Sequence, residues 1–537
     1  VDTAQISCCL MTRASLAAAF DIFDVKGSGQ FTLTELKAIL QRPCAGLPIS
    51  DCQFDRFVEV AGLKALTSKA DIVDALLKTR SKHLAAIQAV LDRIVSKEPE
   101  LNACVEVLGE SALKLAAEAD ARAPDFCRPL EGKPVLVKAN IDLAGTLSTN
   151  ATPGMADFRP TSTASVVAKL LEAGAIPIAK TTMPEAAYGL WGWSQVHGLT
   201  KNPHNPNYTA GGSSTGTAVG IAAGYAEMGL GSDTEGSVRG PAVLAGVCGF
   251  RPSLQRYPND GVVPCNIAHD TIGPMASSMA GIATLDAVIT GVDPASYTPA
   301  TLPSLTVAVA SDWDERLHAA QKAAVEQVIM VLEAAGATVK RGVAFKVVQA
   351  GIEGFNEISY RLEGLRSYCK AHQNMGRTLE EILELSFHVN VKNFFLDPKS
   401  PKGPMVNISD YQGQERAELI KKHEQGMAAW EAKYEAFFIE CSADILLCPS
   451  FVGMPPPVQQ DYSDFFPTLL KHIAPYDAYS ALNGLKVPSL VLPTPAVKIK
   501  DVEGGAMPTG VLLYGKGNAD KALIEVGMAL EAALAMA

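Results

Sequence analysis

The sequence predicts an α/β fold that follows a small helical module at the N-terminus. From about residue 78, helix-like and strand-like segments alternate along the chain, for example over residues 83–107 and 164–183. Such alternation is typical of layered α/β proteins, in which helices cover a β-sheet. The chain has 537 residues, of which 48% are hydrophobic, so it can bury one large core and a smaller module.

The expected division is a helical module over residues 1–78 and a large domain over residues 79–537. The large domain contains a β-rich run, "KPVLVKANID", and strand-like runs return near its end at "DILLCPS", "SLVLPTP" and "GVLLYGK". The segment from about 340 to 440 has a more helical pattern. Gly, Pro and Asn gather at "TKNPHNPNYTAGGSS", which predicts a long loop there.

A stretch within the first 78 residues resembles the calcium loop of an EF-hand. The stretch Asp24–Glu35 lies between two segments with helical apolar spacing and has Gly29 at its sixth position. Calcium prefers six to eight oxygen ligands, with a tight turn at the glycine and a bidentate carboxylate at the end of the loop. The candidate ligands for weak calcium binding are Asp24, Ser28, Gln30 and Glu35.

Two features of this module weaken the prediction of a calcium site. Lys26 places a cation at the third loop position, where an oxygen ligand belongs. A second candidate hand over residues 54–77 has almost no oxygen ligands. Two interpretations therefore stay open: weak calcium binding by the first hand, or a calcium-free scaffold that docks onto a protein partner.

Composition and charge exclude several other classes of protein. The formal net charge of −11 argues against a nucleic-acid binder, which would need a basic face. No uninterrupted stretch of about 18 apolar residues predicts a membrane span. The 11 cysteines are odd in number, scattered and without a CxxC pair. We therefore expect an intracellular, reducing location. The chain begins at Val1, so processing could have removed a targeting segment, and the choice between cytoplasm and an organelle stays open.

Two neighbouring stretches are unusually rich in Gly, Ser and Thr: "GGSSTGTAVG" at 211–220 and "GLGSDTEGSVRGPA" at 229–242. With "KPVLVKANIDLAG" before them and "DTIGPMASSMAG" after them, they resemble the ordered motifs of the amidase signature family of amide hydrolases. The resemblance runs from about residue 80 to 535. The stretch "GFRPSLQRYPNDGVVP" further resembles the branch that contains indoleacetamide and mandelamide hydrolases. The resemblance implies a mixed β-sheet core surrounded by helices.

The resemblance also implies a Ser–cis-Ser–Lys triad. Lys138 of "VKAN" is the expected base, Ser213 the bridging serine after a cis peptide bond, and Ser237 the nucleophile. A serine hydroxyl needs a base to accept its proton, and a lysine can serve only when burial keeps it neutral. The expected oxyanion hole consists of the backbone N–H groups of Thr234, Glu235, Gly236 and Ser237. The substrate would be a small amide, and no metal or cofactor is implied.

Three motifs depart from the family pattern. The usual "KDN" reads "KAN" with Ala139, and the usual "TDTGGS" reads "SDTEGS" with Glu235. The usual "GGSSGGS" reads "GGSSTGT". A glutamate at the hole would strain the backbone if that position required a positive φ, and its charge would oppose a developing oxyanion. Cys265 is expected to form a wall of the cleft and not to be a nucleophile.

Three functions therefore stay open from the sequence. The first is an amidohydrolase that forms an acyl-enzyme and releases a carboxylic acid with ammonia or an amine. The second is a catalytically impaired amidase-fold subunit with a structural role in a larger assembly, which the substitutions at Ala139 and Glu235 favour. The third is the amidase subunit of a transamidase that supplies ammonia to charged tRNA.

Overall fold

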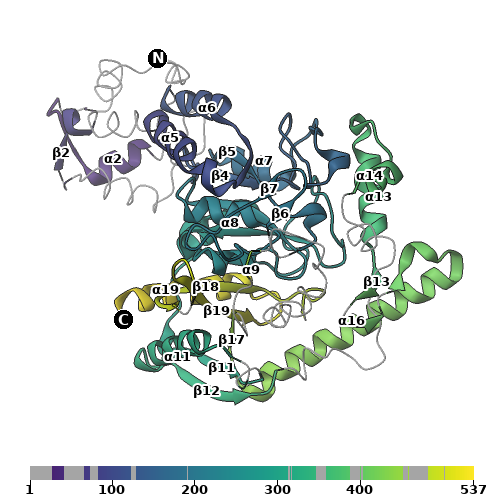
Figure 1. The fold of residues 1–537 in the computed structure, drawn as a ribbon. Coiled ribbons are helices and arrows are strands. Elements are labelled where there is room, and N and C mark those ends of the chain that lie inside the picture. The colour runs from purple at the N-terminus through teal and green to yellow at the C-terminus, as the bar shows by residue number, and fades with distance from the viewer. Residues whose placement is uncertain are drawn as a thin grey trace. The chain divides into compact units, whose positions relative to one another are not determined.

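The computed structural model describes most of the chain (Figure 1). The described residues are 24, 27–40, 64, 66–72, 83–121, 128–189, 192–312, 315, 317–345, 358–386, 399–400, 403–404, 406–450, 457–458, 482–500 and 502–537. The chain divides into two compact units. The smaller unit comprises Val1–Arg93, Leu108–Pro134 and Lys169–Ile178, and the larger unit comprises Ile94–Val107, Val135–Ala168 and Ala179–Ala537. The boundary predicted near residue 78 lies outside the described residues.

Two short strands of the smaller unit pair with each other. β1 and β2 are antiparallel, with Phe31 opposite Thr67. Both residues are buried between more exposed neighbours, the alternation that a pleated strand with one covered face produces. The described part of residues 1–78 therefore includes a small sheet, which corrects the expectation of a wholly helical module. The elements are β1 (Gln30–Thr32), α2 (Leu33–Leu40) and β2 (Leu66–Ser68).

The EF-hand resemblance stays a prediction. The helix expected before the loop and Lys26 both lie outside the described residues. The smaller unit also contains α6 (Gly109–Ala121) and the start of α5 (His83–Leu101). The carboxylate of Asp120 in α6 accepts hydrogen bonds from the backbone N–H groups of His83 and Leu84 at 3.1 and 2.9 Å. It therefore satisfies two of the amides that the start of α5 leaves without helical partners.

An 11-stranded sheet forms the core of the larger unit, in the order β12-β11-β17-β19-β18-β9-β10-β8-β4-β5-β3. β11 runs parallel to β12 and to β17, and β4 runs parallel to β8. The pairs from β17 through β19, β18, β9 and β10 to β8 are antiparallel. The sheet is therefore mixed, as predicted. Its strands are β3 (Cys104–Val107), β4 (Pro134–Lys138), β5 (Ile176–Thr181), β8 (Met228–Asp233), β9 (Cys248–Arg251), β10 (Thr271–Ala276), β11 (Thr306–Ala310), β12 (Thr338–Val343), β17 (Ile445–Pro449), β18 (Ser489–Ile499) and β19 (Met507–Gly515).

Helices pack against this sheet and complete the predicted α/β arrangement. α8, α9, α10, α11 and α19 all contact its strands. Local signals fix their ends: the Ser278 side chain accepts a hydrogen bond from Gly281 N at the start of α10, and Gly291 ends the helix at a φ of 77°. The helices are α7 (Ser165–Glu172), α8 (Thr215–Ala222), α9 (Arg239–Leu244), α10 (Met279–Thr290), α11 (Ala319–Ala334), α13 (Arg361–Ala371), α14 (Leu379–Leu385), α16 (Gly413–Cys441) and α19 (Asp520–Met536).

The described part of residues 340–440 is mostly helical, as its sequence pattern predicts. It contributes α13, α14 and most of α16, which Figure 1 shows as one long unbroken helix. Within the described ranges, no helix combines the length and the apolar composition needed to cross a membrane. Short strand pairs complete the larger unit: β6 (Trp193–Ser194) with β7 (Gly198–Leu199), β13 (Ile358–Ser359) with β16 (Val406–Asn407), and β14 (Lys399–Ser400) with β15 (Gly403–Pro404).

Candidate active site

Lys138 ends β4 inside the protein core. Its side chain is fully buried, because β4 pairs with β8 along a strand that is itself buried throughout. The Lys138 Nζ lies 2.7 Å from Ser213 Oγ, 2.9 Å from Ser232 Oγ and 3.3 Å from the Ser232 carbonyl oxygen. Burial lowers the pKa of Lys138 from 10.5 to about 7. This amine is therefore neutral often enough at neutral pH to accept a proton.

Ser213, the predicted bridging serine, lies on the loop that leads into α8. The peptide bond between Gly212 and Ser213 is cis, as the resemblance implies. Gly211 has a φ of 77°, and a Cβ atom at this position would lie 2.9 Å from Pro241 Cα, so a larger residue would be both strained and crowded. Ser213 is fully buried and faces Lys138. The glycines before Ser213 thus allow the chain to approach α9 closely and present the serine.

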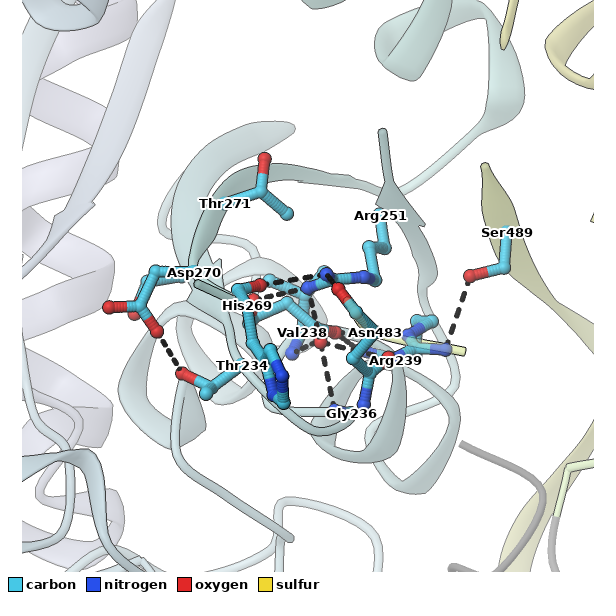
Figure 2. Close-up of polar contacts among 12 residues, drawn as sticks. Thr234, Gly236, Val238, Arg239, Arg251, His269, Asp270, Thr271, Asn483 and Ser489 are labelled. Atoms are coloured by element: carbon cyan, nitrogen blue, oxygen red, sulfur yellow. Dashed lines mark hydrogen bonds and ion pairs between the residues drawn. The ribbon is translucent and has the colours of Figure 1, made fainter. Parts of the chain in front are cut away.

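A buried ionic cluster holds the turn after β8 (Figure 2). The Asp233 carboxylate accepts hydrogen bonds from Gly236 N at 2.8 Å and Val238 N at 3.0 Å. It also pairs with the guanidinium groups of Arg239 at 3.0 Å and Arg251 at 3.2 Å. Burial alone would raise the pKa of Asp233, but the two arginines lower it, so the carboxylate stays ionised. Gly236 takes a φ of 105°, which closes the turn before Ser237.

Ser237 is joined to the bridging-serine loop through the backbone. The Ser237 carbonyl oxygen accepts a hydrogen bond from Ser214 N at 2.9 Å, and Ser237 is 9% exposed. Among the contacts of the described residues there is no hydrogen bond between the hydroxyl groups of Ser237 and Ser213. The structure therefore brings Lys138 and Ser213 into direct contact and places Ser237 on the adjoining turn.

The predicted oxyanion-hole donors lie on this same turn. The Gly236 N–H group already donates to Asp233, which leaves the amides of Thr234, Glu235 and Ser237 as candidate donors. The positive φ of the turn belongs to Gly236, and Glu235 does not share it. The strain expected for a glutamate at this position is therefore absent, although its charge is not.

A second buried carboxylate supports the turn from the other side. Figure 2 shows the Thr234 hydroxyl donating to Asp270, at 2.6 Å from Oδ1. The other oxygen of Asp270 accepts the N–H groups of Cys265 at 2.8 Å and Asn266 at 2.9 Å. Burial raises the pKa of the Cys265 thiol to about 12, so it stays protonated at neutral pH, in keeping with a wall position.

The two substituted motif positions have different surroundings. Ala139 is fully buried in a cluster with Ala151, Met183, Ala187 and Cys265. The Glu235 side chain is 47% exposed, and its Oε1 lies 3.9 Å from Nη2 of Arg361, whose side chain is 5% exposed. Ala139 is thus part of the packed core, whereas Glu235 forms an ion pair with Arg361.

The structure adds residues that the sequence reasoning missed. Ser232 is a second hydroxyl partner of Lys138, and it also accepts a hydrogen bond from Asn140 Nδ2 at 3.0 Å. Both residues stand inside the quoted motifs, so their positions carried a usable signal. Arg361 carried none, because it belongs to the divergent segment far along the chain.

The candidate calcium ligands show a different arrangement. The Asp24 carboxylate accepts hydrogen bonds from Ser28 N at 3.0 Å and Gly29 N at 2.5 Å, and these contacts lower its pKa. The Glu35 carboxylate accepts Thr32 N at 2.9 Å. In the part of the chain that the structure describes, no cluster of three or more His, Cys, Asp or Glu side chains is arranged to hold a metal. Calcium binding by Asp24, Ser28, Gln30 and Glu35 remains a prediction.

Comparison with known proteins identifies relatives of the larger part of the chain. Mandelamide hydrolase of Pseudomonas putida is 40% identical over 216 residues, a match that spans 39% of this chain and only 42% of that protein. Indoleacetamide hydrolase of Rhizobium radiobacter is 27% identical over 482 residues, covering 88% of this chain and 97% of that protein. The chain is thus similar to amide hydrolases over most of its length, with higher identity over a shorter part.

Solved structures agree with these relatives. The peptide amidase of Stenotrophomonas maltophilia matches with a TM-score of 0.64 at 25% identity, over 86% of this chain and 96% of that chain. Fatty acid amide hydrolase matches in fold, with a TM-score of 0.67 at 20% identity, over 90% of this chain and 87% of that chain. A sequence profile of the amidase family matches residues 85–524, a range that contains Lys138, Ser213 and Ser237. The chain therefore belongs to the amidase family.

Proposed function

We propose that the chain hydrolyses carboxylic amides through an acyl-enzyme formed on Ser237. The observation that carries the proposal is the buried Lys138 amine, with its pKa lowered to about 7, at 2.7 Å from Ser213 Oγ. Burying a charged lysine costs free energy, and lysines with a strongly lowered pKa are common at functional sites. Ser213 is the group that Lys138 faces, and the hydrogen bond from Ser214 N to the Ser237 carbonyl oxygen supports Ser237, on the adjoining turn, as the proposed nucleophile.

The proposed reaction begins with two proton transfers. Neutral Lys138 accepts the proton of Ser213, which in turn accepts the proton of Ser237 as the Ser237 Oγ attacks the amide carbonyl carbon. The negative charge that develops on the carbonyl oxygen is stabilised by the N–H groups of Thr234, Glu235 and Ser237. This relay requires a hydrogen bond between the hydroxyl groups of Ser237 and Ser213. Catalytic hydrogen bonds of this kind often tighten only when substrate is bound.

The second half returns the protons. The proton held by Lys138 passes back through Ser213 to the leaving nitrogen, and ammonia or an amine departs. Water then loses a proton along the same path and attacks the acyl ester of Ser237, which releases the carboxylic acid and restores the serine. Each step uses only side chains and backbone N–H groups of this chain, the substrate and water, so the proposal requires no metal or cofactor.

The proposed substrate is a small primary amide with an apolar or aromatic acyl group. This finer proposal is based on the matches to mandelamide hydrolase and indoleacetamide hydrolase, and on the motif around "RYPNDG". It rests on analogy with these relatives. The matches to amide hydrolases do not support the alternative of an impaired structural subunit.

The test is hydrolysis of a panel of aryl and alkyl amides, measured by ammonia release. Ser237→Ala and Lys138→Ala should each lose almost all turnover, because members of a catalytic unit act non-additively. A fluorophosphonate probe should label the wild type and should not label Ser237→Ala. If the wild type takes no label and releases ammonia no faster than Ser237→Ala, the proposed function is wrong.

A further inference from the structure

Glu235 places a negative charge beside the site where the reaction would develop another. It stands between Thr234 and Gly236 on the turn whose amides are the candidate oxyanion donors. An unbalanced carboxylate on the turn that supplies these donors would raise the energy of the tetrahedral intermediate. Since position 235 has no positive φ, this cost is electrostatic and not conformational.

Arg361 lies where it can offset that charge. It is the first residue of α13, and its side chain is 5% exposed while that of Glu235 is 47% exposed. The Arg361 Nη2 atom lies 3.9 Å from Glu235 Oε1. A guanidinium that is mostly removed from water interacts with a nearby charge more strongly than a surface group does.

The start of α13 is fixed against the same turn that supports the candidate hole. Tyr360 N donates to Asn266 Oδ1 at 3.2 Å. A Cβ atom on Gly364 would lie 2.8 Å from Ile267 Cγ2, so the two segments approach closely and a larger residue would require the Ile267 side chain to move. The N–H of Asn266 in turn binds Asp270, which holds Thr234. Arg361 is therefore positioned by packing and hydrogen bonds that lead back to the turn of Ser237.

The surroundings of Tyr188 agree with this placement. Burial raises the pKa of Tyr188 to about 12, the Arg361 guanidinium opposes the rise, and the Glu235 carboxylate adds to it. The charge of Arg361 likewise opposes the rise in the pKa of Cys265. Both charges thus act on the same two side chains, which indicates that they share one region beside the turn.

We propose that Arg361 is a positioning residue that neutralises Glu235 beside the oxyanion site, so that an ion pair replaces the glycine of the related motif. The proposal rests on the proposed amide hydrolysis at Ser237. With the pair intact, the candidate hole carries no net charge from position 235. With Arg361 removed, the unbalanced carboxylate of Glu235 opposes the transition state.

A double-mutant cycle tests this proposal through kcat, with KM measured separately. Arg361→Gln should lower kcat on the order of tenfold, less than the loss of a hole donor usually costs. Glu235→Gln alone should keep or raise kcat, since it removes the repelling charge. The double variant should return to within about threefold of the wild type, because the two changes act on one interaction. A double variant as slow as Arg361→Gln would overturn the proposal.

Two further variants separate charge from structure. Arg361→Lys keeps the positive charge and should retain kcat within about threefold of the wild type. If it is as slow as Arg361→Gln, charge neutralisation is not the role of Arg361. Arg416→Gln is the matched control. Arg416 lies on α16 and pairs at 2.5 Å with Glu363, which lies on α13 together with Arg361. An equal loss of kcat in Arg416→Gln would mean that any disturbance of α13 slows the enzyme, which would also overturn the proposal.

The same experiments distinguish a failure of this inference from a failure of the proposed amide hydrolysis. Labelling of Ser237 by a fluorophosphonate and turnover by the wild type, without rescue in the double variant, would refute the role of Arg361 alone. Absence of both labelling and turnover in the wild type would refute the proposed function and this inference together. Should Arg361→Gln fail to fold, Arg361→Lys and Glu235→Gln still decide: a slow Arg361→Lys, or a Glu235→Gln that loses kcat, overturns the inference.

Discussion

The proposed base predicts how activity depends on pH. Burial lowers the pKa of Lys138 from 10.5 to about 7. A lysine of pKa 10.5 would be neutral in only about 0.03% of molecules at pH 7, whereas at pKa 7 about half are neutral. Between pH 6 and pH 8 the neutral fraction rises from about 9% to about 91%, so kcat/KM should rise about tenfold across this range.

The assay is kcat/KM for an uncharged amide from pH 5 to pH 9, because this ratio reports the free enzyme. Lys180 is the matched control: it is also fully buried, and burial lowers its pKa to about 7. Its Nζ lies 3.3 Å from Ser148 Oγ and also donates to the Ile141 carbonyl, away from the serines of the relay. Lys180→Met should therefore keep the pH midpoint of the wild type. A flat profile, or a midpoint that moves with Lys180→Met, would refute the assignment to Lys138.

Stability supplies an independent reading of the same two lysines. An unfolded lysine holds its proton up to about pH 10.5, whereas folded Lys138 and Lys180 release theirs near pH 7. Between these values the unfolded state binds more protons, so the free energy of unfolding should rise with pH from about 7 to about 10.5. Below pH 7 both states are protonated and this contribution to the slope disappears. Lys138→Met should reduce this rise of the unfolding free energy with pH, measured by urea unfolding at each pH. An unchanged rise would show that the folded Lys138 amine stays protonated.

The remaining predictions concern the turn and the N-terminal module. Asp233→Asn should cost about 3–5 kcal/mol in urea unfolding, because it leaves two buried guanidinium groups without their carboxylate. Gly236→Ala should cost about 1–3 kcal/mol and lower kcat, since its φ of 105° is unfavourable for any other residue; an unchanged melting temperature would contradict this. Isothermal titration should detect at most weak binding of calcium at millimolar concentration, and a micromolar affinity that Glu35→Gln abolishes would reverse the prediction.

Much of the larger unit could be predicted because its signals are local. Strand-like runs and helix caps act within a few residues, so the mixed sheet and its helices followed from pattern and resemblance. The partners of Lys138 were harder to predict, because Ser232 is 94 positions away in the sequence and meets the lysine only when β4 and β8 pair. The smaller unit was predicted too simply, because residue patterns over three positions did not reveal its short strand pair.

The divergent segment contributes more to the site region than its sequence suggested. Arg361 and Tyr368 are seven residues apart on α13, about two turns, and therefore share one face of the helix. Arg361 lies against Glu235, and the Tyr368 hydroxyl donates to the buried Asp142 at 2.8 Å. Asp142 follows Lys138 by four residues, so one face of α13 contacts both the turn that holds Ser237 and the segment just after β4.

Those two contacts connect α13 to the substituted turn and to the segment that follows Lys138. Glu235 adds a charge to the turn, and the oppositely charged partner comes from α13 and not from the motif itself. His372 lies one turn beyond Tyr368. Its Nε2 atom lies 3.0 Å from Asp142 Oδ2, and its ring stacks on the Tyr368 ring with the two centroids 4.1 Å apart. A motif comparison limited to residues 138–237 therefore includes Asp142 and Glu235 but not their partners on and just after α13. If Arg361 offsets the charge of Glu235 in this way, substitution of Arg361 should lower kcat while the contact of Lys138 with Ser213 stays in place, and loss of the Arg416–Glu363 pair elsewhere on α13 should leave kcat unchanged.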